Sequence, residues 1–196
     1  MNEFVPLPDN EPLRVVWPTP GRQLARTRVN PDYGRPGWTR NCGRRFHRGC
    51  DIAPLHVTPS GETTRVVFTD CATQTDFESE EPTFCPHDDV FCVFDGILVE
   101  AVEDEAASDF GKHIVLAHRW PRSGATFYTL YAHLSELRLA NREPRTGDGI
   151  GRMGQTSRNA DARNWLRIAP HLHFEVRDAT GRAYNPLEFL QRFAAQ

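Results

Sequence analysis

The sequence predicts a mainly β protein, with an antiparallel β-sheet core, long loops and a single C-terminal helix. Short runs rich in β-branched and aromatic residues recur along the middle of the chain, and turn residues separate them. Only the last stretch carries a complete helix-start signal. With 196 residues, of which 39% are hydrophobic, the chain can bury one sizeable core, so we expect one folded domain.

Proline dominates the start of the chain. Seven of the 15 prolines precede residue 37. Because proline fixes φ and lacks an N–H donor, we expect residues 1–43 to form an extended N-terminal segment. This segment would pack over a folded domain of residues 44–196.

Seven segments in the remainder have the composition of strands. They are residues 65–69, 91–94, 97–102, 114–118, 126–134, 150–153 and 171–177. Asp95 and Gly96 lie between two of these segments and predict a tight hairpin turn. The pattern favours mostly antiparallel pairing.

An acidic insertion interrupts the strand pattern at about residues 70–90. From Val66 to Gly111 there are 13 acidic residues and no Lys or Arg, which is half of the 26 acidic residues in the chain. Residues 71–89 are polar and poorly periodic, so we interpret them as an inserted loop.

The five cysteines are an odd number, so at least one cannot form an intramolecular disulfide. Cys71 and Cys85 bracket the acidic insertion, and we expect a disulfide between them in an oxidising compartment. A structural zinc ion held by Cys85, His87 and Cys92 is the alternative.

The C-terminal residues predict the helix. Asn185 is its expected N-cap, Pro186 occupies the first helical position, and Glu188 follows three residues after the cap. We expect this helix to close the core.

Composition and charge exclude several classes of function. A net charge of -3 argues against a general nucleic-acid-binding protein. No run of 18 apolar residues occurs, so no membrane span is predicted. Residues 1–6 lack the charged and apolar regions of a secretory signal. We expect a monomer.

The most informative residues are His171 and His173. Strand alternation places both imidazoles on one face, roughly 6.6 Å apart, while Leu172 and Phe174 point into the core. One imidazole can therefore bind an ion while the other acts on whatever the ion holds. A single histidine in a strand is more often a hydrogen-bonded core or rim residue, but the pair favours a metal site.

A second pair, His47 and Asp51, lies upstream. In a straight strand the two would be roughly 13 Å apart, too far to share a metal ion, so the backbone must bend and Gly49 gives it that freedom. Together with one downstream histidine they form a set of two nitrogens and one oxygen, which is typical of catalytic zinc. Cys50, inside this motif, should face away from the ion as a small buried hydrophobe.

The other histidines differ in their prospects. His133 lies at the end of an expected strand, where active-site groups often emerge. His118 is expected to be structural, with a role at the rim of the site as the alternative. For His56, His87 and His113 we expect surface or turn positions.

Five motifs in order resemble the M23 family of zinc metallopeptidases, which includes the LytM and lysostaphin-type peptidoglycan endopeptidases. The motifs are His47-x-Gly49-x-Asp51, Asp95-Gly96, Tyr131-Ala132-His133-Leu134, Gly151-x-x-Gly154-x-Thr156 and Pro170-His171-Leu172-His173-Phe174-Glu175-Val176. The resemblance covers roughly residues 44–190. It implies the LytM-type fold, related to duplicated hybrid motifs.

The resemblance also implies roles for the site residues. His47, Asp51 and His173 would bind one Zn²⁺, and His133 and His171 would flank the reacting water and the scissile carbonyl. The substrate would be a peptide bond in peptidoglycan, either in a stem peptide or in a glycine-rich bridge. The location would be the periplasm, the cell envelope or outside the cell.

Two features depart from the family pattern. About forty residues separate the first motif from Asp95-Gly96, a stretch that the family commonly crosses quickly. Family members often carry a tyrosine shortly before the first ligand, whereas here Trp38 and Asn41 occupy that region and Tyr33 lies further back.

The sequence also allows two alternatives to an active peptidase. One is a non-catalytic relative that binds cell wall or regulates another hydrolase, although such relatives characteristically lose metal ligands and this chain retains all three. The other is a latent enzyme whose N-terminal segment covers the metal, with Asn30 or Asn41 as the fourth ligand.

Overall fold

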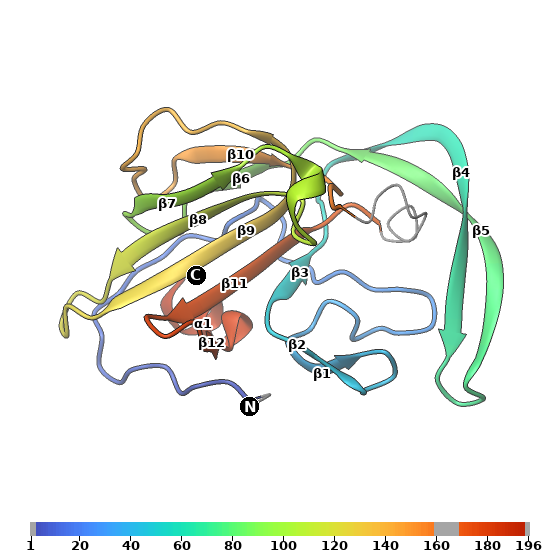
Figure 1. The fold of residues 1–196 in the computed structure, drawn as a ribbon, viewed down its shortest axis with the longest axis horizontal. Helices are drawn as coiled ribbons and strands as arrows, with labels where there is room; N and C mark the ends of the chain where they lie inside the picture. The colour runs from blue at the N-terminus through green and yellow to red at the C-terminus, as the bar shows by residue number, and fades with distance from the viewer. Residues whose placement is uncertain (1–2, 159–168, 195–196) are drawn as a thin grey trace.

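The computed structural model describes residues 3–158 and 169–194. Its centre is an eight-stranded sheet whose pairings between strands are all antiparallel (Figure 1). The strands are β3 (Cys50–Ile52), β6 (Asp89–Phe91), β7 (Ile97–Val102), β8 (Lys112–Arg119), β9 (Thr126–Leu137), β10 (Gly149–Met153), β11 (Leu172–Asp178) and β12 (Ala183–Tyr184). The predicted mainly β fold is therefore confirmed.

The long strand β9 organises this sheet. One of its edges pairs with β8, and its other edge pairs with β11 and, from Leu134 onward, with β10. On its far side β11 pairs first with β3 and then with β12. The chain therefore brings β3, from the first third of the sequence, beside β11, from the last.

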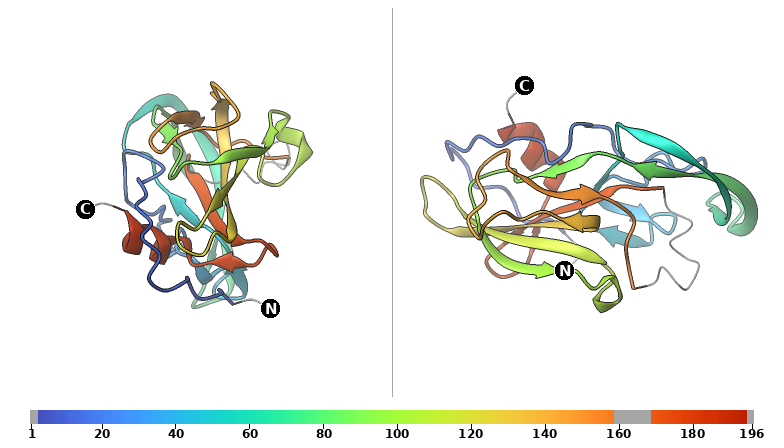
Figure 2. Two further views of the ribbon diagram at one scale, coloured as in Figure 1. Left: turned by 90° about the vertical axis from the view of Figure 1, so that its left-hand side faces the viewer. Right: turned by 90° about the horizontal axis from the view of Figure 1, so that it is seen from above.

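One face of the sheet is covered by the N-terminal segment and by the only α-helix of the described residues, α1 (Pro186–Phe193), as the two views of Figure 2 show. The helix prediction is confirmed, because the Asn185 side chain accepts hydrogen bonds from the backbone N–H groups of Leu187 and Glu188. Buried rings of Trp120, Phe127 and other aromatic residues pack beneath α1.

Residues 3–36 run extended over the domain. Isolated bridges join Val5 to Tyr184 and Val15 to Ala194, and the side chains of Leu7 and Leu13 are buried in the core. Strands β1 (Gly37–Arg40) and β2 (Arg45–His47) then form a short two-stranded ribbon. This segment contributes to the core and leads directly into the first candidate metal ligand.

The acidic insertion is not a loop. Strands β4 (Val57–Asp70) and β5 (Thr75–Pro86) form a long hairpin, which we call the arm and which extends from the sheet in Figure 1. A ribbon that is exposed on both faces needs no apolar alternation, so periodicity could not reveal it. Cross-strand contacts, such as that between Phe68 and Phe77 at 5.7 Å between ring centroids, stabilise it instead.

The expected disulfide is also wrong. Cys71 pairs with Cys42, at the turn of the β1–β2 ribbon, and not with Cys85. Cys85 lies near the end of β5 that is remote from the turn of the arm. Roughly ten residues, about 34 Å of extended strand, separate Cys85 from that turn, which is far beyond the reach of a disulfide.

The alternative zinc site also fails. Cys85 and His87 are exposed, whereas Cys92 is fully buried, and its Sγ donates to the backbone oxygen of Phe94. Among the described residues, these three do not form a group with converging donor atoms.

The predicted hairpin at Asp95 and Gly96 does not form either. Strand β6 ends at Phe91 and pairs with β10, whereas β7 pairs with β8. The Asp95 carboxylate accepts hydrogen bonds from the backbone N–H and the hydroxyl of Thr146. An Asp-Gly pair therefore marks a turn here without specifying which strands it joins.

Three of the four histidines outside the site lie as expected. His118 is buried in the core, where its Nδ1 donates to the backbone oxygen of Asp95 and its Nε2 lies 2.7 Å from the Thr129 hydroxyl. His56 and His87 are exposed. The expectation for His113 is wrong: it is buried, and its Nδ1 donates to the backbone oxygen of Gly111.

No helix among the described residues has the length and apolar character needed to cross a membrane.

His118 should contribute to acid sensitivity. Burial lowers its pKa from 6.5 to about 4, so between these pH values the unfolded chain takes up a proton that the folded protein does not. Stability should fall by up to about 3 kcal/mol as pH drops through this window. Chemical denaturation at pH 7 and pH 4 should show a smaller loss in His118→Gln than in wild type. Exposed His87→Gln is the control, and equal losses in all three proteins would contradict this role.

Candidate metal centre

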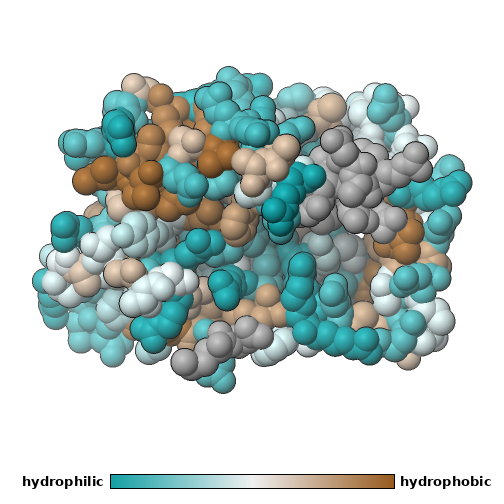
Figure 3. All heavy atoms as spheres, viewed as in Figure 1, coloured by the Kyte–Doolittle hydropathy of each residue, from teal (hydrophilic) through white to brown (hydrophobic). Residues whose placement is uncertain are grey.

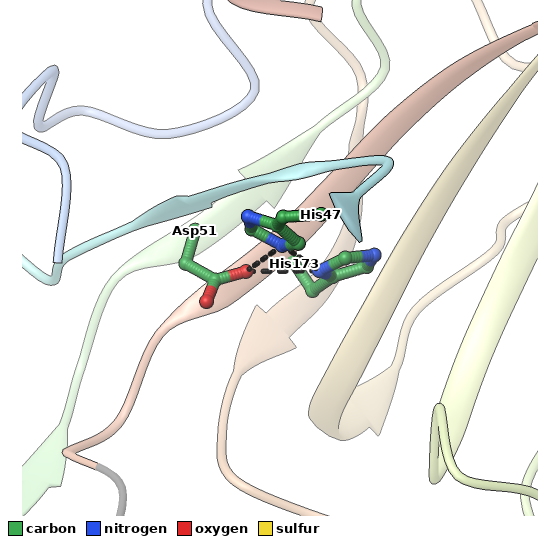
Figure 4. A group of neighbouring side chains, drawn as sticks. All are labelled: His47, Asp51 and His173. Carbon is green, nitrogen blue, oxygen red and sulfur yellow. Dashed lines mark hydrogen bonds and ion pairs between the residues drawn. The ribbon is translucent and has the colours of Figure 1, made fainter. Parts of the chain in front are cut away.

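Three side chains from three strands meet at one end of the sheet (Figure 4). His47 ends β2, Asp51 lies in the middle of β3, and His173 is its direct partner on β11. His47 Nε2 lies 3.2 Å from His173 Nδ1 and 3.2 Å from Asp51 Oδ1. His173 Nδ1 lies 2.8 Å from the same carboxylate oxygen. All three residues are buried, and among the described residues this is the only group of metal-binding side chains whose donor atoms converge in this way.

The triangle of donor atoms fits a small tetrahedral cation. Bonds of 2.0–2.2 Å in tetrahedral geometry place neighbouring ligand atoms about 3.3 Å apart, close to the 2.8–3.2 Å edges of this triangle. Two imidazoles and one carboxylate are also a common donor set for catalytic zinc. The residues present therefore fit the ion that the sequence predicts.

Outer hydrogen bonds point the correct ring nitrogens inward. His47 Nδ1 donates to the backbone oxygen of Arg35 at 2.8 Å, so the lone pair of Nε2 faces the triangle. In His173 the assignment is reversed, since Nε2 lies 2.9 Å from Glu175 Oε1 and Nδ1 faces the triangle. A hydrogen bond at the outer nitrogen fixes both tautomer and ring orientation in metal-binding histidines.

Gly49 makes this approach possible. It lies between β2 and β3, where the chain leaves its straight path as the spacing of His47 and Asp51 required. A Cβ at this position would lie 2.4 Å from the His173 ring and 2.8 Å from the backbone oxygen of Phe174. The glycine therefore provides space for a ligand as well as a bend. Cys50 is fully buried, as expected, and burial raises the pKa of its thiol.

Electrostatics reflect the close contact of the ligands. Burial lowers the pKa of His173, but hydrogen bonds to Asp51 and Glu175 outweigh this and raise it to about 9. Burial raises the pKa of Asp51, yet neighbouring imidazoles and Arg40 hold it well below its usual range. The site therefore attracts positive charge, and a metal ion would compete with a proton for His173.

His133 reaches the site through a β-bulge. Ile114 pairs with Tyr131 and Lys112 pairs with Leu134, so β9 contains one extra residue at this point. His133 has a left-handed backbone with φ 63°, which turns its side chain toward the side where His173 lies. The strand continues to Leu137, so His133 lies in a kink and not at a strand end as the sequence suggested.

His133 and His171 stand side by side next to the triangle. Their ring centroids are 4.9 Å apart, and His133 lies 5.8 Å from His173. His133 Nδ1 donates to the backbone oxygen of Thr156, and His171 Nδ1 donates to that of Ala169. Burial lowers the pKa of both, so both imidazoles are neutral near pH 7.

Two residues of the N-terminal segment also line the site. The Arg40 guanidinium is buried; its Nη2 donates to Asp51 Oδ2 and lies 3.1 Å from His47 Nε2. The same guanidinium stacks on the ring of Tyr33, 3.6 Å from the centroid. Sequence reasoning missed Arg40, because one arginine among many carries no motif, and it left Tyr33 without a role.

The Asn30 side chain is not placed to act as a fourth metal ligand. Its side-chain nitrogen donates to the backbone oxygen of Thr39, and its side-chain oxygen accepts from the backbone N–H of Asp32. Asn41 is exposed in the β1–β2 turn and lines a separate pocket beneath the arm. Neither residue lines the cleft that contains the triangle.

An open cleft of about 350 Å³ gives access to these groups. It is bordered by His47, Asp51, His133, His171 and His173, together with Tyr33, Arg40, Arg45, Phe46, Arg48, Asp109, Phe110 and Glu175. A peptide could therefore reach the candidate ligands and both neutral imidazoles at once.

Comparison with known proteins agrees with this architecture. The model of Peptidase family M23 matches residues 78–186, more than half of the chain, and the protein belongs to this family. The match includes His133, His171 and His173 but begins after His47 and Asp51. Geometry alone therefore brings the first two candidate ligands to the histidines of the matched region.

Several solved structures are similar to this chain, and the first of those below, with a TM-score above 0.5, shows the same fold. Helicobacter pylori Csd3 aligns with a TM-score of 0.52 and 17% identity, covering 94% of this chain and 35% of Csd3. The catalytic domain of lysostaphin from Staphylococcus simulans aligns at 0.48 and 21% identity, covering 81% of this chain and 90% of that domain. The catalytic domain of the prophage-encoded M23 protein EnpA from Enterococcus faecalis aligns at 0.47 and 17%, covering 87% and 94%. A search of curated proteins found no match.

Glu175 should affect metal binding without being a ligand. Glu175→Gln removes the charge that orients His173, so zinc affinity should fall about tenfold while the fold is retained. Competition with a fluorescent chelator measures this affinity. Exposed Glu136→Gln on β9 is the control. Unchanged affinity in Glu175→Gln would show that the contact is only structural.

Proposed function

We propose that this protein is a zinc-dependent endopeptidase that hydrolyses peptide bonds in bacterial peptidoglycan, in stem peptides or cross-bridges. The main observation behind this proposal is the buried triangle of His47, Asp51 and His173, with two neutral imidazoles beside it in one open cleft. Membership of the M23 family supports the peptidase class.

His47, Asp51 and His173 would hold one zinc ion. When bound, zinc supplies a Lewis acid that polarises a carbonyl and lowers the pKa of water toward 7. Three protein ligands leave a coordination position for reactants, as in other catalytic zinc sites. The charge of the bound site would be near +1, which favours an anionic transition state.

His133 and His171 would handle protons. In each ring Nδ1 donates to a backbone carbonyl, so Nε2 carries the lone pair when the ring is neutral. Either imidazole can accept a proton from the attacking water at Nε2 and, as the imidazolium formed in that step, donate to the developing oxyanion and deliver the proton to the leaving amine. Tyr33, whose pKa is raised by burial, stays protonated and is a further donor on the cleft wall.

We also propose that the protein works outside the cytoplasm. The Cys42–Cys71 disulfide joins the ribbon to the arm. Disulfides of this kind persist in the periplasm and outside cells but are rare in reducing compartments. Peptidoglycan lies in the same space.

Digestion of purified peptidoglycan tests the activity. The zinc-loaded protein should release fragments that mass spectrometry identifies as products of peptide hydrolysis, and a chelator should abolish their release. Zinc should restore it. A protein that holds zinc but releases no fragments would be the non-catalytic relative instead.

His133→Asn separates catalysis from metal binding. Asparagine tolerates the left-handed backbone at this position, so the fold should be preserved. The variant should keep one zinc ion and lose about 10²–10⁴-fold in the rate of cleavage. Metal analysis and fragment release measure the two properties, with exposed His87→Asn as control. Wild-type activity in His133→Asn would remove this residue from the mechanism.

A further inference from the structure

We propose that the β1–β2 ribbon carries a subsite for a substrate carboxylate, formed by Arg45 with Arg40 behind it. The substrate is then a peptide with a free carboxylate close to the scissile bond, and not an uncharged glycine-rich bridge. This inference rests on the proposed peptidase function and specifies its substrate class.

The first observation is the pairing of two arginines. Arg40 and Arg45 are direct cross-strand partners in the ribbon, although like charges in such positions repel each other. Alternation along β2 puts Arg45 on the same face as His47, roughly 6.6 Å away. Both arginines border the cleft that contains the candidate metal ligands. The ribbon therefore directs two positive charges toward the reaction site.

The second observation is the incomplete bonding of Arg40. Its Nη2 contacts Asp51 and His47, but Nε and Nη1 are buried and have no hydrogen-bond partner among the described residues. A buried guanidinium normally has acceptors for its donors. The Arg40 guanidinium is held in place by stacking on the Tyr33 ring, although two of its nitrogens lack acceptors among the described residues. Donors without acceptors at the wall of a cleft are suited to an acceptor that arrives with the substrate.

The third observation is the state of the nearby acids. Asp51 contacts the two imidazoles and Arg40, Glu175 contacts His173 and Arg177, and Asp109 contacts Arg158. Arg45 is exposed and, within the part of the chain that the structure describes, forms no ion pair with any of them. Its charge is therefore available to an anion from outside.

The chemistry of the anion follows from these donors. Guanidinium groups bind carboxylates through paired, charge-assisted hydrogen bonds. The Arg45 position is about two strand residues from His47, and successive Cα atoms of a peptide are about 3.8 Å apart. The bound carboxylate therefore belongs to a residue within one or two positions of the scissile bond.

Binding experiments test the subsite directly. The zinc-loaded His133→Asn protein is titrated with cross-linked stem peptides whose carboxylates are free, and with the same peptides converted to carboxamides. Calorimetry should show at least tenfold tighter binding of the free-acid form. Adding Arg45→Met should remove most of this preference, and Arg45→Lys should retain part of it. Equal affinity for the two forms would overturn the proposal.

Arg44→Met is the matched control. Arg44 neighbours Arg45 and is exposed, but its guanidinium contacts Gln74 and does not border the cleft. The preference for the free acid should persist in this variant. If Arg44→Met and Arg45→Met reduce it equally, the effect is one of general charge and the subsite is wrong.

Cleavage rates distinguish this proposal from the proposed function. Wild-type kcat/KM should be at least tenfold higher for the free-acid peptides than for the carboxamides or for pentaglycine. Equal cleavage of all three would refute the subsite and leave the peptidase function intact. Selective binding without cleavage of any peptide would refute the peptidase function and leave the subsite intact.

Discussion

The pairing of β3 with β11 is the constraint on which the site depends. It sets Asp51 directly beside His173, although 122 residues separate them in sequence. Strand partners have nearly fixed separations, so this register determines the distance between two candidate ligands before any ion is present. The remaining elements adjust to that pair: Gly49 provides space for the His173 ring, β2 delivers His47, and Glu175 holds the outer nitrogen.

The same sheet explains why the reactive groups lie at one end. The imidazole of His133 comes from a bulge in β9, the strand that pairs with β11 on its other side. A regular strand would have turned this side chain toward the core, because its neighbour Ala132 is the partner of His173. A local irregularity in the ladder thus adds a fourth imidazole to the group without adding a new element.

Sequence reasoning was most successful where chemistry is local. The caps of α1, the strand at residues 97–102 and the need for a bend between His47 and Asp51 depend on neighbours within a few residues. The ordered motifs also indicated the family to which the chain belongs. These features depend little on how distant segments meet.

It failed where partners are distant in sequence. The arm resembled a loop because both of its faces are largely exposed, and Cys71 was matched to Cys85 because both bracket the acidic insertion. Burial of His113 depends on the β7–β8 register, which no local pattern specifies. The place of Arg40 beside Asp51 follows only from the meeting of the ribbon with β3.

The Cys42–Cys71 disulfide has a consequence for the entropy of metal binding. It lies in the turn of the ribbon, where Asn41, Cys42 and Gly43 all have left-handed backbones. His47 is only five residues from this covalent link. Its strand, β2, is therefore tied to the arm on one side and leads into β3, which pairs with β11, on the other. Chain freedom that the crosslink has already removed is not lost again when an ion is bound. The arm, which is remote from the candidate metal site in sequence, thereby preorganises His47, one of the candidate ligands.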